Sequence, residues 1–325
     1  MNAGAARAMR PAVRARREKI VIVTRQTALE ELITRFGTAG QVKFYLEHAG
    51  QDYAPIAAAH AQYRAVLDGV RSLVPAGVKH QVIDRAFLPQ FTFGAADLIV
   101  TVGPDGLVVN TAKYLDGQPI VAVNPDPTHI EGILLPFTGR DVARAIEAAL
   151  SHEPRIKRVT MAETTLNDGQ RLLAFNDFFV GARSHVSARY RIASGGQSEQ
   201  QSSSGILIST GAGSTGWLKS VYAGASRVIE ALGGQVKPPP EGGRFPWEAD
   251  RLVYVVREPW PSKTTGATLA YGVITKDRPL VVTSQMAENG VIFSDGVEAD
   301  YLAFTAGLTA TVRVADKKAN LVAAY

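Results

Sequence analysis

The chain has 325 residues, 46% of them hydrophobic, and a formal net charge of +5. It has no cysteine, which excludes disulfides, thiolate metal sites and a cysteine nucleophile. No apolar run approaches the roughly 20 residues that a membrane helix needs. The excess charge lies in residues 1–17, which carry five arginines and no acid, so a nucleic-acid-binding body is not indicated.

The first half of the chain alternates apolar strands with helical stretches. We predict strands over residues 19–24, 78–84, 97–102 and 119–124, and helices over 27–36, 56–73, 107–115 and 140–150. Strands that alternate with helices favour a parallel sheet covered on both faces.

From residue 155 onward the pattern changes to short apolar or alternating segments. They predict strands over residues 159–164, 171–175, 188–192, 206–209, 252–256, 269–274, 280–283, 291–294 and 310–314. One helix, over 216–232, interrupts them, and a Gly/Pro-rich loop over 233–246 follows it. The predicted fold class is an α/β Rossmann-like N-terminal domain plus an all-β C-terminal domain.

These patterns divide the chain into three segments. Residues 1–18 are expected to be a disordered basic tail, residues 19–152 an α/β nucleotide-binding domain, and residues 153–325 a β-rich domain. The extreme C-terminus could return to the first domain. An Arg-rich tail without acids is also a feature of organelle transit peptides, although this one lacks serine.

Gly103-Pro104-Asp105-Gly106 joins the strand over 97–102 to the helix over 107–115. A strand, a glycine turn and a helix start direct backbone N–H groups at a phosphate. Pro104 has no N–H group to contribute. The segment therefore predicts a phosphate loop with one donor fewer than a glycine would give.

A second glycine cluster, Ser209-Thr210-Gly211-Ala212-Gly213-Ser214-Thr215-Gly216-Trp217, lies between an apolar strand and the helix over 216–232. It has the G-x-G-x-x-G spacing of a dinucleotide site, but a Gly/Pro loop follows the helix where a second strand should come. A nucleophile elbow at Ser214 would need a later histidine, and the last histidine is His185. We favour a turn whose N–H and O–H groups hold phosphate or ribose. A ligand-free turn is the alternative.

Two such loops, one in each half, suggest a ligand held in a cleft between the domains. Together with two further blocks they make the chain resemble the NAD kinase family. The four blocks are Gly103-Pro104-Asp105-Gly106, Asn176-Asp177, residues 209–217 and Ser294-Asp295-Gly296. The segments 123–136, 202–214 and 255–260 look closest to the mitochondrial type of that family. The six histidines show no metal-ligand spacing.

The resemblance implies transfer of the γ-phosphoryl group of ATP, or of polyphosphate, to the adenosine 2′-hydroxyl of NAD. Mg²⁺ would enter with ATP and no protein ligand set would hold it. Asp105 would orient the 2′-hydroxyl or accept its proton, and Gly103, Pro104 and Gly106 would form the phosphate loop. The implied NAD-binding residues are Asn176, Asp177, Ser204, Thr210, Gly213, Ser214, Thr215, Gly216, Trp217 and Ser220, and Asp295 is a further candidate.

The chain departs from the family pattern mainly on the donor side. Pro104 replaces a glycine, and losing one N–H bond to a phosphate costs roughly 1.5–3 kcal/mol. Leu107 stands where the family usually has threonine, Asp177 shortens a glutamate and Trp217 replaces a tyrosine. The alternatives to a working NAD kinase are a weak or inactive dinucleotide-binding relative, and a lipid or sugar kinase of the same superfamily.

The expected partners are NAD and ATP, with neither nucleic acid nor membrane. The resemblance implies a homodimer or a homotetramer. The expected location is cytoplasmic, or mitochondrial if residues 1–18 are a transit peptide.

Overall fold

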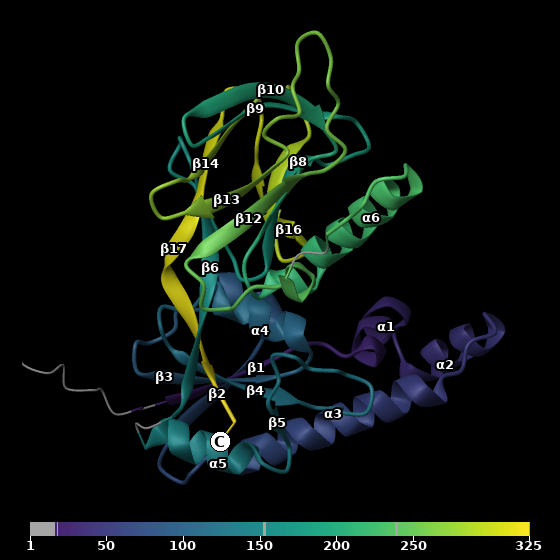
Figure 1. Cartoon of the computed structure of the whole chain (residues 1–325). Helices are drawn as coiled ribbons and strands as arrows, with labels where there is room; N and C mark the ends of the chain where they lie inside the picture. Colours follow the sequence, from purple (N-terminus) through teal and green to yellow (C-terminus); the bar gives the residue numbers. More distant parts are fainter. Residues whose placement is uncertain (1–16, 18, 152–153, 238–239, 325) are drawn as a thin grey trace, which may run out of the picture.

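The computed structural model describes residue 17 and residues 19–151, 154–237 and 240–324. Figure 1 shows two halves, a lower one with helices around a sheet and an upper one built mainly of strands. Apart from Arg17, the predicted tail lies outside the described residues, and so does the predicted boundary at 152–153. The domain limits therefore stay a prediction. None of the helices in the described ranges is long and apolar enough to cross a membrane.

The lower half is a parallel sheet with helices on both faces. Its strands follow the order β2-β1-β3-β4, and a short strand, β5, pairs with β4. The strands are β1 (Lys19–Thr24), β2 (Lys79–Asp84), β3 (Asp97–Val102), β4 (Pro119–Asn124) and β5 (Phe137–Thr138). The helices are α1 (Ala28–Phe36), α2 (Ala39–His48), α3 (Ala54–Ser72), α4 (Asp105–Ala112) and α5 (Val142–Leu150).

Strands β1, β3 and β4 are continuous apolar runs because both faces of the sheet are covered. Residues such as Ile22 and Val100 pack against α3 and α5. Their neighbours along the strands, such as Val21 and Ile99, pack against α4. Helix α4 thus lies on the face of the sheet toward the upper half, and its buried side chains fix where its first residue, Asp105, lies.

The upper half consists of antiparallel strands and one long helix, α6. Its six-stranded sheet follows the order β13-β12-β11-β8-β15-β16, and a core of large side chains, including Tyr190, Tyr254 and Phe178, separates it from the remaining strands. The strands are β6 (Ile156–Leu166), β7 (Arg171–Ala174), β8 (Asp177–Ala182), β9 (Ala188–Ser194), β10 (Gln197–Ser203), β11 (Ile206–Ser209), β12 (Arg251–Val256), β13 (Tyr271–Thr275), β14 (Leu280–Ser284), β15 (Gly290–Ser294), β16 (Val297–Ala303) and β17 (Thr309–Val322), and α6 is Trp217–Ala231.

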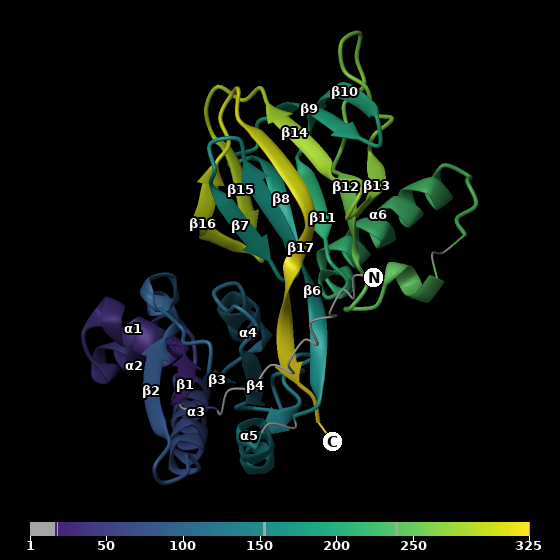
Figure 2. The ribbon, with the colours of Figure 1, turned by 90° about the vertical axis from the view of Figure 1, so that its left-hand side faces the viewer.

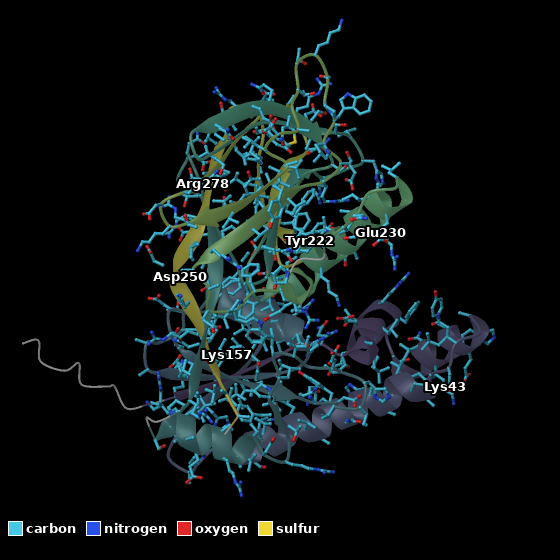
Figure 3. All side chains as sticks on the ribbon, in the orientation of Figure 1. Lys43, Lys157, Tyr222, Glu230, Asp250 and Arg278 are labelled. Atoms are coloured by element: carbon cyan, nitrogen blue, oxygen red, sulfur yellow. The ribbon has the colours of Figure 1, made fainter. Side chains whose placement is uncertain are left out.

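The long strands β6 and β17 connect the halves, as Figure 2 shows. They pair with each other, and Asn320 and Leu321 of β17 also pair in parallel with β4. The lower sheet therefore continues into the upper half without a break. Lys157, labelled in Figure 3, lies at this junction with its Nζ 3.6 Å from the centre of the Trp247 ring. Continuous backbone pairing and buried contacts hold the halves together.

The predicted fold class is confirmed: an α/β parallel sheet is followed by an antiparallel all-β sheet. The predicted strands and the helix over 216–232 occur with shifts of a few residues, except that β17 is far longer than the predicted 310–314. Helix α2 and the strands β5, β8, β10 and β16 were not predicted. Strand β10, QSEQQSS, has no apolar side chain and exists because it pairs with β9 along its whole length.

Candidate functional site

The turn over residues 103–106 leaves the end of β3 and starts helix α4. Gly103 N–H donates to the Val123 carbonyl at 3.2 Å, which fixes the turn to β4. Pro104 caps the helix with φ −73° and ψ 169°, and the Leu107 N–H donates to its carbonyl at 2.8 Å. The first N–H groups of a helix have no acceptor inside it. Those of Asp105 and Gly106 therefore open at the end of α4 where an anion is stabilised.

Asp105 is partly buried and already makes one contact with the protein. Its Oδ1 accepts a hydrogen bond of 2.6 Å from the N–H of Leu134, a buried residue in the loop after β4. At the start of the same loop, the Asn124 side chain donates to the Ile130 carbonyl and accepts from the Asp126 N–H, both at 2.9 Å. The loop therefore orients the Asp105 carboxylate and leaves Oδ2 as the oxygen for a ligand.

Leu107, the second departure from the family pattern, is a core residue. Its side chain is 2% exposed and packs in the cluster between the sheet and α4. A Cβ atom on Gly103 would lie 2.8 Å from Leu107 Cδ2, so the two residues are packed closely. The Leu107 side chain therefore packs under the turn over residues 103–106 and holds it against the core.

Residues 175–177 form a tight turn into β8, whose first residue is Asp177, and other segments satisfy the backbone of this turn completely. The Asp295 carboxylate accepts from the N–H groups of Phe175 (3.1 Å), Asn176 (2.7 Å) and Asp177 (3.2 Å). Thr210 binds the carbonyls of Phe175 and Asn176, through Oγ1 at 2.6 Å and through its N–H at 2.9 Å. The Asp295 N–H donates to the Asp177 carbonyl at 2.9 Å. The backbone is fixed, while the partly buried side chains of Asn176 and Asp177 make no hydrogen bond within the described residues.

The second glycine cluster wraps around this turn. Gly213 must be glycine, because a Cβ atom there would lie 2.2 Å from the Asn176 carbonyl oxygen. Thr210 Oγ1 also accepts from Gly213 N–H at 3.2 Å, and Ser214 Oγ donates to the Gly211 carbonyl at 2.7 Å. Thr210 and Ser214 are fully buried. Their hydroxyls therefore hold the loop in shape and face away from solvent.

Two further hydroxyl residues, Thr215 in this block and Ser220 on α6, lie nearer the surface than Thr210 and Ser214. Thr215 Oγ1 donates to the Ala212 carbonyl at 3.2 Å, and Ser220 on α6 is exposed, with its Oγ 3.4 Å from the Gly216 carbonyl. The Gly216 N–H donates to the Gly213 carbonyl at 3.0 Å and closes the turn before α6.

The two acids beside this turn have shifted pKa values. Burial and the nearby Asp295 carboxylate raise the pKa of Asp177 to about 7. Burial also raises the pKa of Asp295, while Lys113 and the three N–H donors of the turn oppose that shift. A partly buried carboxyl that titrates near neutrality can donate a hydrogen bond to a ribose hydroxyl or accept one from it.

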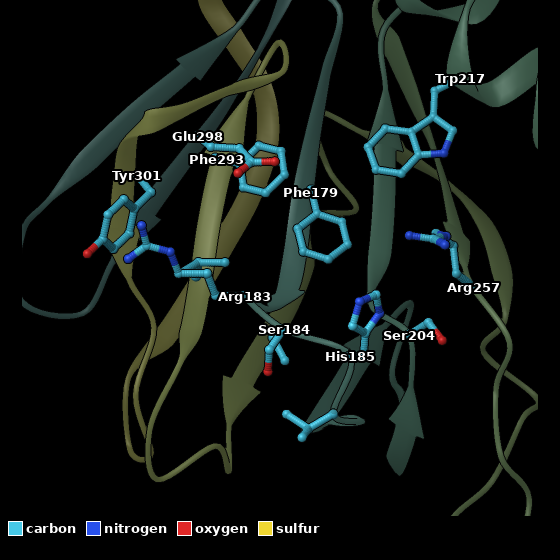
Figure 4. Close-up of a pocket in the computed structure, with 13 residues that line it drawn as sticks. Phe179, Arg183, Ser184, His185, Ser204, Trp217, Arg257, Phe293, Glu298 and Tyr301 are labelled. Atoms are coloured by element: carbon cyan, nitrogen blue, oxygen red, sulfur yellow. The ribbon is translucent and has the colours of Figure 1, made fainter.

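A cavity of about 390 Å³ lies on the outer face of the upper sheet, beside the start of α6 (Figure 4). Trp217 and Phe179 are stacked there with ring centres 6.0 Å apart and an interplanar angle of 11°. Phe293 continues the series, 5.0 Å from Phe179. These flat faces can stack with a base or another heteroaromatic ring.

Cations accompany the aromatic rings in this cavity. The Arg257 guanidinium lies 5.4 Å from the Trp217 ring centre, and that of Arg183 lies 5.0 Å from the Tyr301 ring centre. The exposed residue Ser204 lines the cavity beside Arg257, whose carbonyl accepts its N–H at 2.9 Å. Stacking surfaces beside two guanidinium groups suit an aromatic ligand that carries an anionic group.

Two more cavities lie closer to helix α4. One of about 460 Å³ adjoins Pro104 and has mainly apolar walls, with Arg25, His60 and Tyr63 among them. The other, of about 720 Å³, lies between the halves and is lined by Lys113 and Asp116 from below and by Arg171 and Asp300 from above. In the described ranges no group of three or more His, Asp or Glu residues is arranged to hold a metal ion.

Two structures resemble this chain over nearly its whole length. A yeast NADH kinase solved with NADH matches 94% of this chain and 84% of that one, with a TM-score of 0.59 and 14% identity. An NAD kinase from Archaeoglobus fulgidus in complex with ATP matches 94% of this chain and 93% of that one, with a TM-score of 0.53 and 16% identity. The chain has the fold of NAD kinases.

Sequence comparison gives a narrower match. A curated NAD kinase from Geobacter metallireducens is 28% identical over 130 residues, which cover 38% of this chain and 45% of that protein. The chain thus matches less than half of the length of this relative. No family model matches the chain.

Within this NAD kinase fold, the predicted site residues form two groups around one core. Leu107 of α4, Phe175 of the turn and Ala212 of the glycine cluster share a buried cluster, so three of the four sequence blocks meet there. The fourth block joins them through the hydrogen bonds from the turn to the Asp295 carboxylate. Ser204 and Trp217 lie apart, in the cavity on the upper sheet. Sequence reasoning did not single out Lys113, Phe179 or Arg257. Only Arg257 had a signal, since it lies in the segment 255–260 that carried the resemblance.

Proposed function

We propose that this protein is an NAD kinase, which transfers the γ-phosphoryl group of ATP to the adenosine 2′-hydroxyl of NAD and forms NADP. The observation that carries the proposal is the placement of Asp105. It opens helix α4 with an oriented carboxylate, and α4 packs on the same buried cluster as the turn of Asn176 and Asp177. The NAD kinase fold over 94% of the chain supports it.

Asp105 Oδ2 would accept the proton of the 2′-hydroxyl, or orient that hydroxyl, while Leu134 holds Oδ1. The free N–H groups of Asp105 and Gly106 would face the phosphates. Phosphate oxygens are the ligands that Mg²⁺ prefers, so we propose that Mg²⁺ enters with ATP. Polyphosphate remains the alternative donor.

NAD would contact both groups of site residues, those around the buried cluster and those in the cavity on the upper sheet. Asn176 and Asp177 would bind the adenosine ribose with their side chains, while Thr210, Gly213, Ser214 and Asp295 would hold their backbone. We propose that Trp217, with Ser204, Thr215, Gly216 and Ser220 near it, lines the rest of the dinucleotide path. Base stacking on an aromatic ring contributes about 1–3 kcal/mol.

We also propose the finer assignments that the resemblance implies: the mitochondrial type of NAD kinase, a homodimer or homotetramer, and a cytoplasmic location, or a mitochondrial one if residues 1–18 are a transit peptide. A dinucleotide-binding relative without kinase activity is the second candidate. Pro104 favours it, because this residue supplies no N–H donor at the phosphate loop.

The test is NADP formation by purified protein with NAD, ATP and Mg²⁺, read with an NADP-specific dehydrogenase. Asp105→Asn is the matching variant, because its amide oxygen can still accept from Leu134 while the charge is lost. Asp68→Asn is the control, since Asp68 is exposed on α3 and pairs with Arg71.

NADP formed by the wild type and by Asp68→Asn, but reduced at least a hundredfold in Asp105→Asn, would support the kinase. Saturable NAD binding without NADP would favour the non-catalytic relative. Neither binding nor product would point to another acceptor, such as a lipid or a sugar.

A further inference from the structure

Helix α4 carries a second functional feature just beyond its last turn. Lys113 follows the helix, and its side chain is only 4% exposed. Its Nζ donates to Ser294 Oγ at 2.9 Å and lies 3.9 Å from an oxygen of the Asp300 carboxylate. Burying an ammonium group is costly unless other groups compensate its charge. This lysine therefore needs the acidic end of the β15–β16 hairpin.

That hairpin end also carries Asp295, the next residue after Ser294. Asp295 (φ 57°) and Gly296 (φ 69°) form the two-residue turn between the paired residues Ser294 and Val297, and Asp-Gly is a favoured sequence for such a hairpin turn. In this conformation the Asp295 carboxylate accepts the three N–H groups of residues 175–177 while the Asp295 N–H donates back to Asp177. The hairpin turn thus directs the Asp295 carboxylate at the turn over residues 175–177.

These contacts form a continuous connection between the two parts of the proposed site. Asp105 begins α4, and Lys113 lies eight residues later, about 12 Å along the helix at 1.5 Å per residue. Lys113 then contacts the hairpin end, and Asp295 contacts the turn that carries Asn176 and Asp177. In the described part of the chain, the segment of α4 and the two residues after it makes its hydrogen bonds to the upper half through those two residues, Lys113 and Tyr114.

We propose that Lys113 and Asp295 are positioning residues that fix the turn of Asn176 and Asp177 relative to helix α4 and its Asp105. This inference rests on the proposed kinase function. Apolar packing between α4 and the turn is strong but not directional. The hydrogen bonds of Lys113 and Asp295 are directional, so they can fix the orientation of the turn relative to α4. A displacement of about 1 Å at a reacting group can cost a hundredfold in rate.

The experiment compares Lys113→Met, Lys113→Arg, Asp295→Asn and Tyr114→Phe with the wild type. Lys113→Met keeps the length of the stem but loses the charge, and Lys113→Arg retains it. Asp295→Asn keeps one acceptor oxygen but replaces the other with a donor. Tyr114→Phe is the matched control, because it removes the other polar contact of the same segment, the bond to Asp300.

Two readouts are needed. The first is hydrogen exchange of the backbone amides of residues 175–177 in ligand-free protein, which requires no substrate. The second is steady-state kinetics with NAD and ATP varied separately. We expect faster exchange at these amides in Lys113→Met and Asp295→Asn. We also expect a KM for NAD raised about tenfold or more and a kcat lowered about 10- to 100-fold, with the KM for ATP changed less than twofold.

Lys113→Arg should recover most of the kcat, and Tyr114→Phe should behave like the wild type. Unchanged amide exchange in Lys113→Met, or equal losses in Lys113→Met and Lys113→Arg, would overturn the inference. So would a fall in the amount of folded protein with unaltered KM and kcat per folded molecule. A wild type that forms no NADP would refute the kinase function instead, and the exchange measurement would still decide whether Lys113 and Asp295 fix the turn.

Discussion

Thr210→Val tests the geometry of the turn most directly. Thr210 is fully buried, and its hydroxyl makes two hydrogen bonds, to the Phe175 carbonyl at 2.6 Å and from the Gly213 N–H at 3.2 Å. Valine has nearly the same shape, so it opens no cavity but leaves both backbone groups without their partner. Each unpaired buried group costs about 1–3 kcal/mol, so the loss of two partners should lower the free energy of unfolding by about 2–6 kcal/mol.

Thr210→Ser is the matched control. It keeps the hydroxyl and loses one methyl group, at a cost of about 1 kcal/mol. Urea unfolding followed by tryptophan fluorescence measures the stability of both variants, because Trp217 and Trp260 lie in the upper half and Trp247 lies at its junction with the lower half. A Thr210→Val variant no less stable than Thr210→Ser would refute the reasoning. The two Thr210 hydrogen bonds would then contribute nothing to the turn.

Two further predictions concern Asp177 and Pro104. Because the pKa of Asp177 is about 7 in the folded protein and lower when unfolded, the folded state binds the extra proton between about pH 4 and 7, and stability falls as pH rises through this range. Asp177→Asn should therefore be about as stable as the wild type at pH 4 but more stable by about 1–3 kcal/mol at pH 8, which thermal unfolding at both pH values would detect. Pro104→Gly should raise kcat/KM for ATP about 10- to 100-fold if residue 104 faces the donor phosphates, at a cost of about 1 kcal/mol in stability. Unchanged kinetics would remove Pro104 as the cause of a weak donor site.

The sequence predicted the parts of the fold whose cause is local. Strands β1, β3 and β4 are buried on both faces, so their apolar runs identify them without further information. Strand β10 is the opposite case, since its polar sequence becomes a strand only through the pairing with β9. The sequence of helix α2 also gives only a weak helical pattern, because Val42 and Leu46 are its only buried residues.

The candidate site shows the same division. The glycine clusters can be recognised in the sequence, because tight turns and close backbone contacts need glycine, as Gly213 shows. Lys113 gives no such signal: its partner Ser294 is 181 residues away, and a lysine after a helix is ordinarily exposed. The inward direction of the Thr210 and Ser214 hydroxyls was equally hidden, because a hydroxyl in a glycine-rich turn can bind a ligand or the loop itself.

The structure also limits what Pro104 can change at the phosphate loop. The proline adopts the φ of −73° that its ring requires, and the turn uses its carbonyl, which proline retains, as the acceptor for Leu107. The substitution therefore removes one donor without disturbing the start of α4. The N–H groups of Asp105 and Gly106 keep their direction, and the Asp105 carboxylate keeps its anchor at Leu134. Since the charge and orientation of Asp105 do not depend on residue 104, the proline should weaken donor binding far more than the activation of the acceptor hydroxyl.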